Sequence, residues 1–492
     1  MSHSPKLSSL FNNTKLRTPN DISDLSGMCS VCSDKCPGLC EIGLSAVRGI
    51  EAAYPFGTAN NQFASEKVYP FDFSHFNING RVFGAMGAAE DSETTNVHSV
   101  DISYEFGYER KIKLRAPVIL PAMAKLNWQD YYSGAAMAGV MVVIGENAVK
   151  LDKDLQHDSN GKVSHAPFLG KMIEYFRRYD RGYGDIILQV NADDIVLGTA
   201  EYALKNFDLK TIEIKFGQAA KGIQHVAPVN SAEEAEFLKK NGYLVFENPN
   251  GSGLIQCGRL PMWNEASLGE IIARFRAYGA KNIFFKMAGF DVNDIRRVLQ
   301  IASANNVDLI TFDGAGGGSG NSPNKMMNEW SHPTIDLIKI VNRLIGELRE
   351  ENLWIPEIAI AGGIAMDDTM FKALALGAPN IKLVGIGRAA MAAAVTGKNV
   401  GELVENDATP ASYKAFGDTA DTIFKDANYI KSIYKETGKP ISYGAIGLYS
   451  YLSRLSFGLK LLMALNRKFS LKYIHQSDVI PLTKEAREYT LP

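Results

Sequence analysis

The feature that most constrains the fold is a regular alternation of short β-branched runs with segments of helical periodicity, which begins at Pro117. Such alternation predicts a parallel sheet whose strands are connected by helices. Eight strands favour a closed (β/α)8 TIM barrel over an open doubly wound sheet. The eight predicted strands lie near residues 117, 142, 186, 212, 283, 309, 357 and 382.

The rest of the chain divides around this barrel. An insertion at 225–265 contains FENPNGSG and CGRLPMW, and we expect it to form loops over one mouth of the barrel. Beyond residue 400 no strand signal is found, and helices are predicted at Ser412–Phe416, Ala420–Tyr434 and Gly444–Leu465. The predicted domains are an N-terminal segment with a cysteine motif, the barrel, and a C-terminal helical extension, at 1–105, 106–400 and 401–492.

Charge and hydropathy exclude several classes of function. The net charge of −2 gives no basic excess that would attract nucleic acid or an anionic membrane. The N-terminus is polar and lacks the apolar core of a signal peptide. The longest apolar stretch, Tyr443–Leu465, is interrupted by Arg454 and Lys460, so it predicts an amphipathic or buried helix. We expect a cytoplasmic protein that binds neither nucleic acid nor a membrane.

Glycine-rich segments follow three consecutive predicted strands. The strand near 309 leads into FDGAGGGSGNSP (Phe312–Pro323), the strand near 357 ends in Gly362-Gly363, and the strand near 382 ends in Gly385–Arg388. Glycines let backbone N–H groups approach a ligand closely, as a phosphate or a flat ring requires. Loops after the seventh and eighth strands, with a helix N-terminus, are the usual phosphate site of this fold. The pattern predicts a phosphate-bearing cofactor.

Two lysines, Lys215 in IEIKFG and Lys286 in IFFKMAG, lie at or just before strand ends. Side chains alternate between the two faces of a strand, and an outward-facing lysine would not fit the alternation of the apolar residues beside it. We therefore expect both lysine side chains to be buried. A buried lysine is costly unless it is paired with an anion. Beside a flavin, such a cation would stabilise the reduced, anionic form.

Four of the five cysteines, Cys29, Cys32, Cys36 and Cys40, form a C-x₂-C-x₃-C-x₃-C motif. In a reducing compartment this clustering indicates a metal or cluster rather than disulfides. Four thiolates so close together can ligate a 4Fe–4S cluster from one loop. Structural zinc and the absence of any metal remain alternatives. The fifth, Cys257, stands alone and is interpreted as a partly buried thiol in a loop.

Four ordered segments resemble one family. The segment KFGQAAKG (Lys215–Gly222) is similar to KIAQGAKPG of the FMN-binding synthase domain of glutamate synthase, and Gly317–Pro323 is similar to its GGTGASP. Gly362-Gly363, a helix and then Leu376–Ala378 resemble its GG and LGA, and Gly385–Arg388 resembles its last phosphate loop. The resemblance covers residues 115–395 and is closer still to the single-chain archaeal and bacterial members.

The resemblance implies an FMN-dependent oxidoreductase and assigns residues to it. Lys215 and Lys286 would contact the flavin, and Gln218 and Lys221 would lie toward the carboxylates of 2-oxoglutarate. Lys221 or Glu146 would handle protons. The implied cofactor-binding residues are Ala122, Met123, Lys215, Lys286, Gly317, Gly318, Gly362, Gly363, Gly385, Gly387 and Arg388.

The chain also departs from the family pattern around the substrate. The family's TGEGG appears as Ile144–Ala148, which keeps only Gly-Glu, and KPGEGG becomes Lys221–Val226. The cluster cysteines that follow the last phosphate loop of the large enzymes are absent, so the N-terminal cysteines would replace them. No N-terminal catalytic cysteine or glutaminase domain is found, so ammonia would come from elsewhere.

These observations favour an enzyme that passes electrons from an iron–sulfur cluster to FMN and reduces a 2-oxo or 2-imino acid. The expected partners are a small-molecule substrate (2-oxo acid or amino acid) and either a ferredoxin-like electron donor or a separate ammonia-supplying subunit. We also expect a homo-oligomer. An FMN barrel without net redox, as in isomerases of diphosphates, is one alternative. A non-catalytic or electron-relay subunit of a larger complex is another.

Overall fold

The computed structural model describes residues 41–49, 69, 71–88, 93–123, 125–217, 226–247, 253–317 and 330–490. Eight parallel strands close into a barrel, and they follow one another around it in chain order. The predicted (β/α)8 fold is confirmed. The strands are β4 (Val118–Met123), β5 (Met141–Ile144), β8 (Asp185–Val190), β9 (Thr211–Lys215), β13 (Asn282–Ala288), β14 (Leu309–Asp313), β15 (Glu357–Ala361) and β16 (Ile381–Gly385).

Helices surround the barrel because each has an apolar face. In α11, residues Ile335, Ile338, Val341 and Ile345 recur at helical spacing and are buried. Side-chain caps fix several helix starts, as where Asp291 accepts hydrogen bonds from two backbone N–H groups of α9. The surrounding helices are α3 (Trp128–Ala138), α4 (Pro167–Arg177), α5 (Ala192–Leu197), α6 (Thr199–Phe207), α8 (Glu265–Ala277), α9 (Val292–Ala304), α11 (Thr334–Glu350), α12 (Asp367–Gly377) and α13 (Arg388–Glu405).

A hairpin closes the amino end of the barrel. Strands β2 (Tyr104–Phe106) and β3 (Ile112–Leu114) pair antiparallel, and Phe106 stacks on Phe284 of β13 inside the barrel, at 5.9 Å between ring centroids. Beside this contact, Arg110 forms an ion pair with Asp185. This end of the barrel interior is therefore filled by protein side chains.

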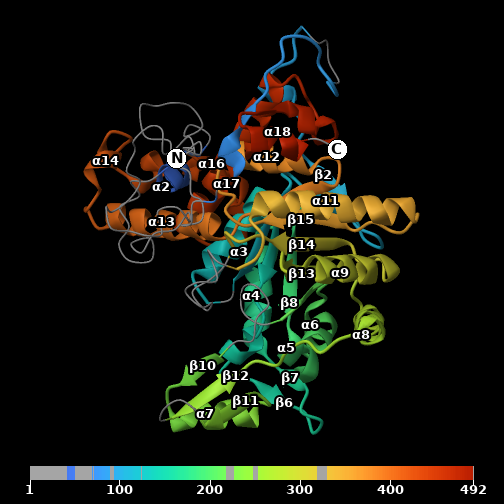
Figure 1. Ribbon diagram of the computed structural model, residues 1–492. Coiled ribbons are helices and arrows are strands. Elements are labelled where there is room, and N and C mark those ends of the chain that lie inside the picture. Colours follow the sequence, from blue (N-terminus) through green and yellow to red (C-terminus); the bar gives the residue numbers. More distant parts are fainter. Residues whose placement is uncertain are drawn as a thin grey trace.

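The insertion after β9 differs from the prediction of loops. It forms a three-stranded antiparallel sheet in the order β10-β12-β11, at the bottom of Figure 1. Lys150 donates a hydrogen bond to Gln256, and Arg259 pairs with Asp193, so the sheet packs on the segments that follow β5 and β8. Cys257 ends β12 and is partly exposed, in a strand rather than a loop. The elements here are β10 (Val226–Val229), α7 (Ala232–Lys240), β11 (Leu244–Glu247) and β12 (Leu254–Cys257); η6 (Ala148–Leu151), β6 (Gln156–His157) and β7 (Val163–His165) lie between β5 and α4.

The C-terminal region is largely helical, as predicted, and α17 (Tyr443–Leu465) is its central element. This helix packs against α13, α3 and α2 (Glu41–Arg48). Its Arg454 is buried and forms an ion pair with Asp367 of α12. None of the helices in the described part of the chain combines the length and apolarity needed to cross a lipid bilayer.

Two features of this region differ from the prediction. The helix expected at 420–434 is divided into α15 (Ala420–Ile423) and α16 (Ala427–Ile433), and between them Lys425 N–H donates to the carbonyl of Val47 in α2. Strand β17 (Val479–Pro481), which was not predicted, pairs antiparallel with β1 (Phe76–Ile78). The other elements are η4 (Phe73–His75), η5 (Val97–Ser99), α14 (Ala411–Lys414), η7 (Lys435–Thr437), η8 (Leu471–Tyr473), η9 (Gln476–Asp478) and α18 (Lys484–Thr490).

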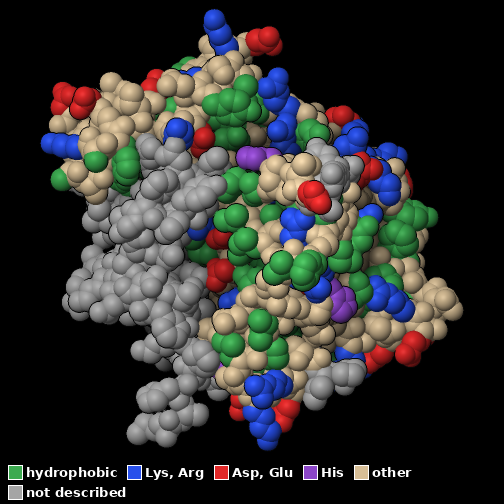
Figure 2. All heavy atoms as spheres, turned by 90° about the horizontal axis from the view of Figure 1, so that it is seen from above, with side chains coloured by type: hydrophobic (Ala, Val, Ile, Leu, Met, Phe, Trp, Pro, Cys, Tyr) green, Lys and Arg blue, Asp and Glu red, His purple; other side chains and the backbone are tan. Residues whose placement is uncertain are grey.

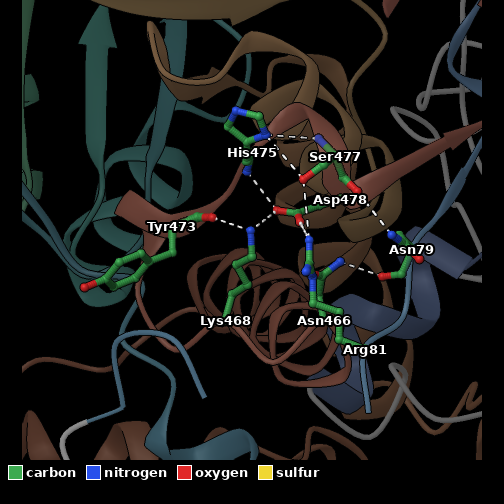
Figure 3. A network of polar contacts seen from close by, with 8 residues as sticks. All are labelled: Asn79, Arg81, Asn466, Lys468, Tyr473, His475, Ser477 and Asp478. Atoms are coloured by element: carbon green, nitrogen blue, oxygen red, sulfur yellow. Dashed lines mark hydrogen bonds and ion pairs between the residues drawn. The ribbon is translucent and has the colours of Figure 1, made fainter. Parts of the chain in front are cut away.

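A buried polar network joins the segments next to β1 and β17 (Figure 3). Asp478 is fully buried, and its carboxylate lies 2.8 Å from Lys468 Nζ and 3.4 Å from Arg81 Nη2. Asn466 donates a hydrogen bond to the carbonyl of Asn79, 2.5 Å away. Because every contact lies within this junction, the network is interpreted as structural. On the face shown in Figure 2, acidic and basic side chains are interspersed.

Candidate active site at the carboxyl ends of the strands

A glycine-lined pocket lies where β14, β15 and β16 end. It brings together six residues that were predicted to bind a cofactor, and it adds Pro121 and Asp313, which were not singled out from the sequence. The six predicted residues are Gly317, Gly362, Gly363, Gly385, Gly387 and Arg388.

Two kinds of constraint explain the glycines. Gly362 and Gly363 have φ angles of +114° and +80°, which side-chain-bearing residues rarely adopt. A Cβ atom on Gly317 would lie 2.0 Å from Asp313 Oδ1, and one on Gly385 would lie 2.6 Å from the Cβ of Ala361. A side chain would therefore strain the backbone at Gly362 or Gly363, and it would clash with neighbouring protein atoms at Gly317 or Gly385.

Helix α13 begins at the wall of the pocket. Its N-cap is Gly387, whose lack of a side chain leaves the first N–H groups without a side-chain cap. Arg388 Nη2 donates a hydrogen bond to the carbonyl of Gly316, 2.7 Å away. A helix N-terminus with uncapped N–H groups and an adjacent guanidinium favours an anion.

Both predicted lysines are buried inside the barrel, with Lys215 4% and Lys286 5% exposed. Lys215 Nζ lies 2.6 Å from Glu146 Oε1. Lys286 Nζ lies 3.4 Å from Asp313 Oδ2, too far for a strong hydrogen bond, and it has no hydrogen-bond partner among the described residues. The second lysine is thus a buried cation with unused donors, next to a pocket residue.

A further carboxylate, Glu213, lies one interior position before Lys215 on β9 and is 2% exposed. It accepts a hydrogen bond from Gln189 Nε2 at 2.6 Å. Burial raises the pKa of Glu213, and the Lys286 cation and the Gln189 hydrogen bond oppose that rise. Burial and the nearby lysine cations therefore act in opposite directions on the ionisation of this acid.

The turn that carries Glu146 is held by another buried acid. Asn147 has a φ of +58°, and its backbone N–H donates to Asp194 Oδ2 at 2.9 Å. Burial is the main cause that raises the pKa of Asp194 to about 7, and the nearby Glu146 carboxylate adds to the rise. Asp194 thus fixes the backbone next to the Lys215–Glu146 pair.

The other predicted residues are distributed as follows. Ala122 and Met123 end β4 and are partly exposed, and the carbonyl of Met123 accepts hydrogen bonds from Gly145 N–H and from the Tyr132 hydroxyl. The predictions for Gln218, Lys221, Gly318, Cys29, Cys32, Cys36 and Cys40 lie outside the described residues. Within the described ranges, no group of three or more His, Cys, Asp or Glu side chains is arranged to hold a metal ion.

Sequence reasoning missed Gln189, Glu213 and Asp313. A signal was present, because Glu213 has the same strand parity as Lys215, and Asp313 has the same parity as Leu309 in the barrel interior. Polar residues that alternate inside a barrel strand indicate a site when they lie near its carboxyl end.

Fold and site together define a (β/α)8-barrel protein with an anion-favouring pocket at the carboxyl ends of its strands. Residues 178–397 match the family described as a conserved region in glutamate synthase. This match confirms the resemblance noted from the motifs of the chain. No curated protein sequence matches the chain.

Solved structures match the chain at low sequence identity. The flavin-binding domain of baker's yeast flavocytochrome b2 has a TM-score of 0.47 and 14% identity, over 85% of this chain and 79% of that chain. A putative lactate oxidase of Pediococcus acidilactici has a TM-score of 0.44 and 14% identity, over 84% of each chain. (S)-Mandelate dehydrogenase, described as a monotopic membrane protein, has a TM-score of 0.43 and 11% identity, over 83% of this chain and 89% of that chain.

Proposed function

We propose that the protein is an FMN-dependent oxidoreductase that reduces a 2-oxo or 2-imino acid to an amino acid, an enzyme of the class that acts on CH–NH2 donors. One observation carries the proposal. In a chain whose residues 178–397 match the glutamate synthase family, a glycine-lined pocket lies at the N-terminus of α13, which has no side-chain cap. Asp313 lines this pocket and pairs with Lys286, a buried lysine whose ammonium group has no hydrogen-bond partner among the described residues.

The residues present fit FMN. Gly362, Gly363, Gly385 and Gly387 give the backbone close access to a phosphate, and Arg388 adds a positive charge at the start of α13. Ala122 and Met123 would pack beside the ring, with Gly317 and Gly318 near the same cofactor. When bound, FMN would supply hydride transfer and would exchange electrons singly or in pairs.

The chain's own polar residues would divide the remaining tasks. Lys286 would stabilise negative charge on the cofactor, since its ammonium group has no hydrogen-bond partner among the described residues. Glu146, held 2.6 Å from Lys215, would hold and move a proton at its carboxylate. Gln218 and Lys221 would orient the substrate carboxylates.

Electrons would enter through a 4Fe–4S cluster on Cys29, Cys32, Cys36 and Cys40, supplied by a ferredoxin-like donor. Ammonia would come from a separate subunit or from solution. Iron and sulfide analysis of the purified protein tests this part by itself. A cluster requires both elements, whereas zinc without sulfide would support the structural-zinc alternative.

The main test is a half-reaction. Protein reconstituted with FMN, iron and sulfide is reduced with dithionite without oxygen, and 2-oxoglutarate and ammonium are added. Flavin reoxidation with formation of an amino acid is expected, slowed about 100-fold in Glu146→Gln. A protein that stays colourless after reconstitution contradicts the proposal. Flavin that is never reoxidised by any 2-oxo acid with ammonium, but is reoxidised by a protein acceptor, supports the electron-relay alternative instead.

A further inference from the structure

Among the described residues, the charged side chains grouped around the two buried barrel lysines include one more acid than cation. Two buried lysines face three carboxylates, which leaves a surplus of one when all five groups are ionised. The cations are Lys215 and Lys286, and the carboxylates are those of Glu146, Glu213 and Asp313.

Glu213 is the surplus acid. Lys215 is paired with Glu146 and Lys286 with Asp313. In the described part of the chain, no Lys, Arg or His nitrogen lies within 4.0 Å of the Glu213 carboxylate, which is held by the neutral amide of Gln189. An ionised carboxylate in such surroundings is costly, so burial favours its protonated form.

An acceptor for the added proton lies on the same amide. Gln189 Nε2 donates to Glu213 Oε1, and Gln189 Oε1 is buried with no hydrogen-bond partner among the described residues. A protonated Glu213 can donate to this oxygen, whereas an ionised Glu213 leaves it unsatisfied.

Lys286 connects Glu213 to the pocket. In the β9–β13 ladder, Glu213 is opposite Phe284 and Lys215 is opposite Lys286, so Glu213 and Lys286 are diagonal neighbours in the barrel interior. The Lys286 charge is the largest influence that favours the ionised form of Glu213. Lys215 acts in the same direction, and Glu146 opposes ionisation. An anionic group bound against Lys286 would compensate that charge and would add its own repulsion.

We propose that Glu213 is a proton-coupled positioning residue, which takes up one proton when an anionic oxygen binds against Lys286 and releases it when that group leaves. The proton comes from solvent and adds to a carboxylate oxygen, so no electron moves and no bond to the ligand forms. The inference rests on the proposed function, because FMN and a 2-oxo acid are the two sources of such an oxygen. Uptake of a proton by Glu213 would keep the net charge of the buried site constant when an anionic ligand binds.

The test is proton uptake in weakly buffered solution, followed with a pH indicator dye. One arm adds FMN to the protein without flavin, and the other adds 2-oxoglutarate to the FMN-loaded protein. In the arm whose ligand places an anionic oxygen at Lys286, wild type should take up more protons than Glu213→Gln, with a difference of up to one proton per chain. Glu213→Asp, which can still titrate, should restore the uptake. Asp185→Asn, which changes a buried acid at the amino end of the same barrel, should behave as wild type.

Two results separate failure of this inference from failure of the proposed function. Absence of FMN binding by wild type overturns the proposed function. FMN binding with equal proton uptake by wild type and Glu213→Gln in both arms overturns the role of Glu213. In case Glu213→Gln does not fold, the infrared carbonyl band of protonated carboxylic acid in wild type gives the answer. It should intensify when the anion binds at fixed pH, and an unchanged band contradicts the inference.

Discussion

The two ends of the barrel interior use buried polar groups in opposite ways. At the amino end, Arg110 Nε donates to Asn282 at 3.0 Å, its Nη2 donates to Thr211 at 2.9 Å, and the guanidinium pairs with Asp185. At the carboxyl end, Lys286 Nζ has no hydrogen-bond partner among the described residues. Polar groups at the amino end satisfy one another and stabilise the barrel, whereas at the carboxyl end Lys286 Nζ and Gln189 Oε1 are left available to a ligand or a proton.

The largest expected effect is on stability at the amino end. Arg110→Leu removes the cation from Asp185, whose side chain is 13% exposed and whose pKa is raised by burial, a rise that Arg110 opposes. We expect the free energy of unfolding to fall by about 3 kcal/mol, as measured by urea denaturation. FMN affinity of the folded fraction should not change. A loss below about 0.5 kcal/mol would contradict the view that this end is a stabilising network.

The next effect depends on pH and concerns Asp194, at the carboxyl end. Its pKa of about 7 in the folded protein lies above the ordinary 3.8, so the folded state binds more protons between these values and stability falls as pH rises through this window. Asp194→Asn keeps an oxygen acceptor for the Asn147 N–H but cannot ionise. The unfolding free energy of Asp194→Asn minus that of wild type should therefore increase by on the order of 2 kcal/mol between pH 5 and pH 8.

Urea denaturation at the two pH values measures this difference. A constant difference between Asp194→Asn and wild type across the range would show that Asp194 does not titrate there. The neutral amide would then be equivalent to the carboxylate at this position.

A matched pair of threonines gives the smallest and sharpest contrast. Thr211 Oγ1 interacts with Arg110 and Asp185, whereas Thr311 Oγ1 is buried with no hydrogen-bond partner among the described residues. Thr211→Val should cost about 1–2 kcal/mol of unfolding free energy, and Thr311→Val should be neutral or slightly stabilising. Equal losses in thermal denaturation of the two variants would remove the distinction between the two ends.

Much of the fold was predictable because the barrel strands and helices are local patterns. All eight predicted strands occur in the barrel, and its surrounding helices show apolar faces at regular spacing. Strand β17 was not predictable because three residues ending in Pro481 carry little local signal, and its partner Phe76 lies far away in the chain. The sheet in the insertion was missed because the Gly- and Pro-rich segments beside its strands suggested loops.

The candidate site was predictable where glycine reports a backbone constraint. Gly362 and Gly363 have positive φ angles, and they lie in the same pocket as Arg388, as their strand-end positions indicated. Strand parity already pointed to Glu213, but only the closed barrel shows that its side chain meets Gln189 inside it. The Lys286–Asp313 pair likewise required the register of β13 and β14.

The most direct test of the account is a titration of the protein without flavin by FMN, followed by quenching of flavin fluorescence. Wild type should bind one FMN per chain. Lys286→Met should bind at least tenfold more weakly, because a charge-assisted interaction of about 1.5–3 kcal/mol is lost, with binding measured under conditions in which the variant is folded. Failure of wild type to bind FMN, or equally tight binding by Lys286→Met, would contradict the claim that the carboxyl end of this barrel is a flavin site.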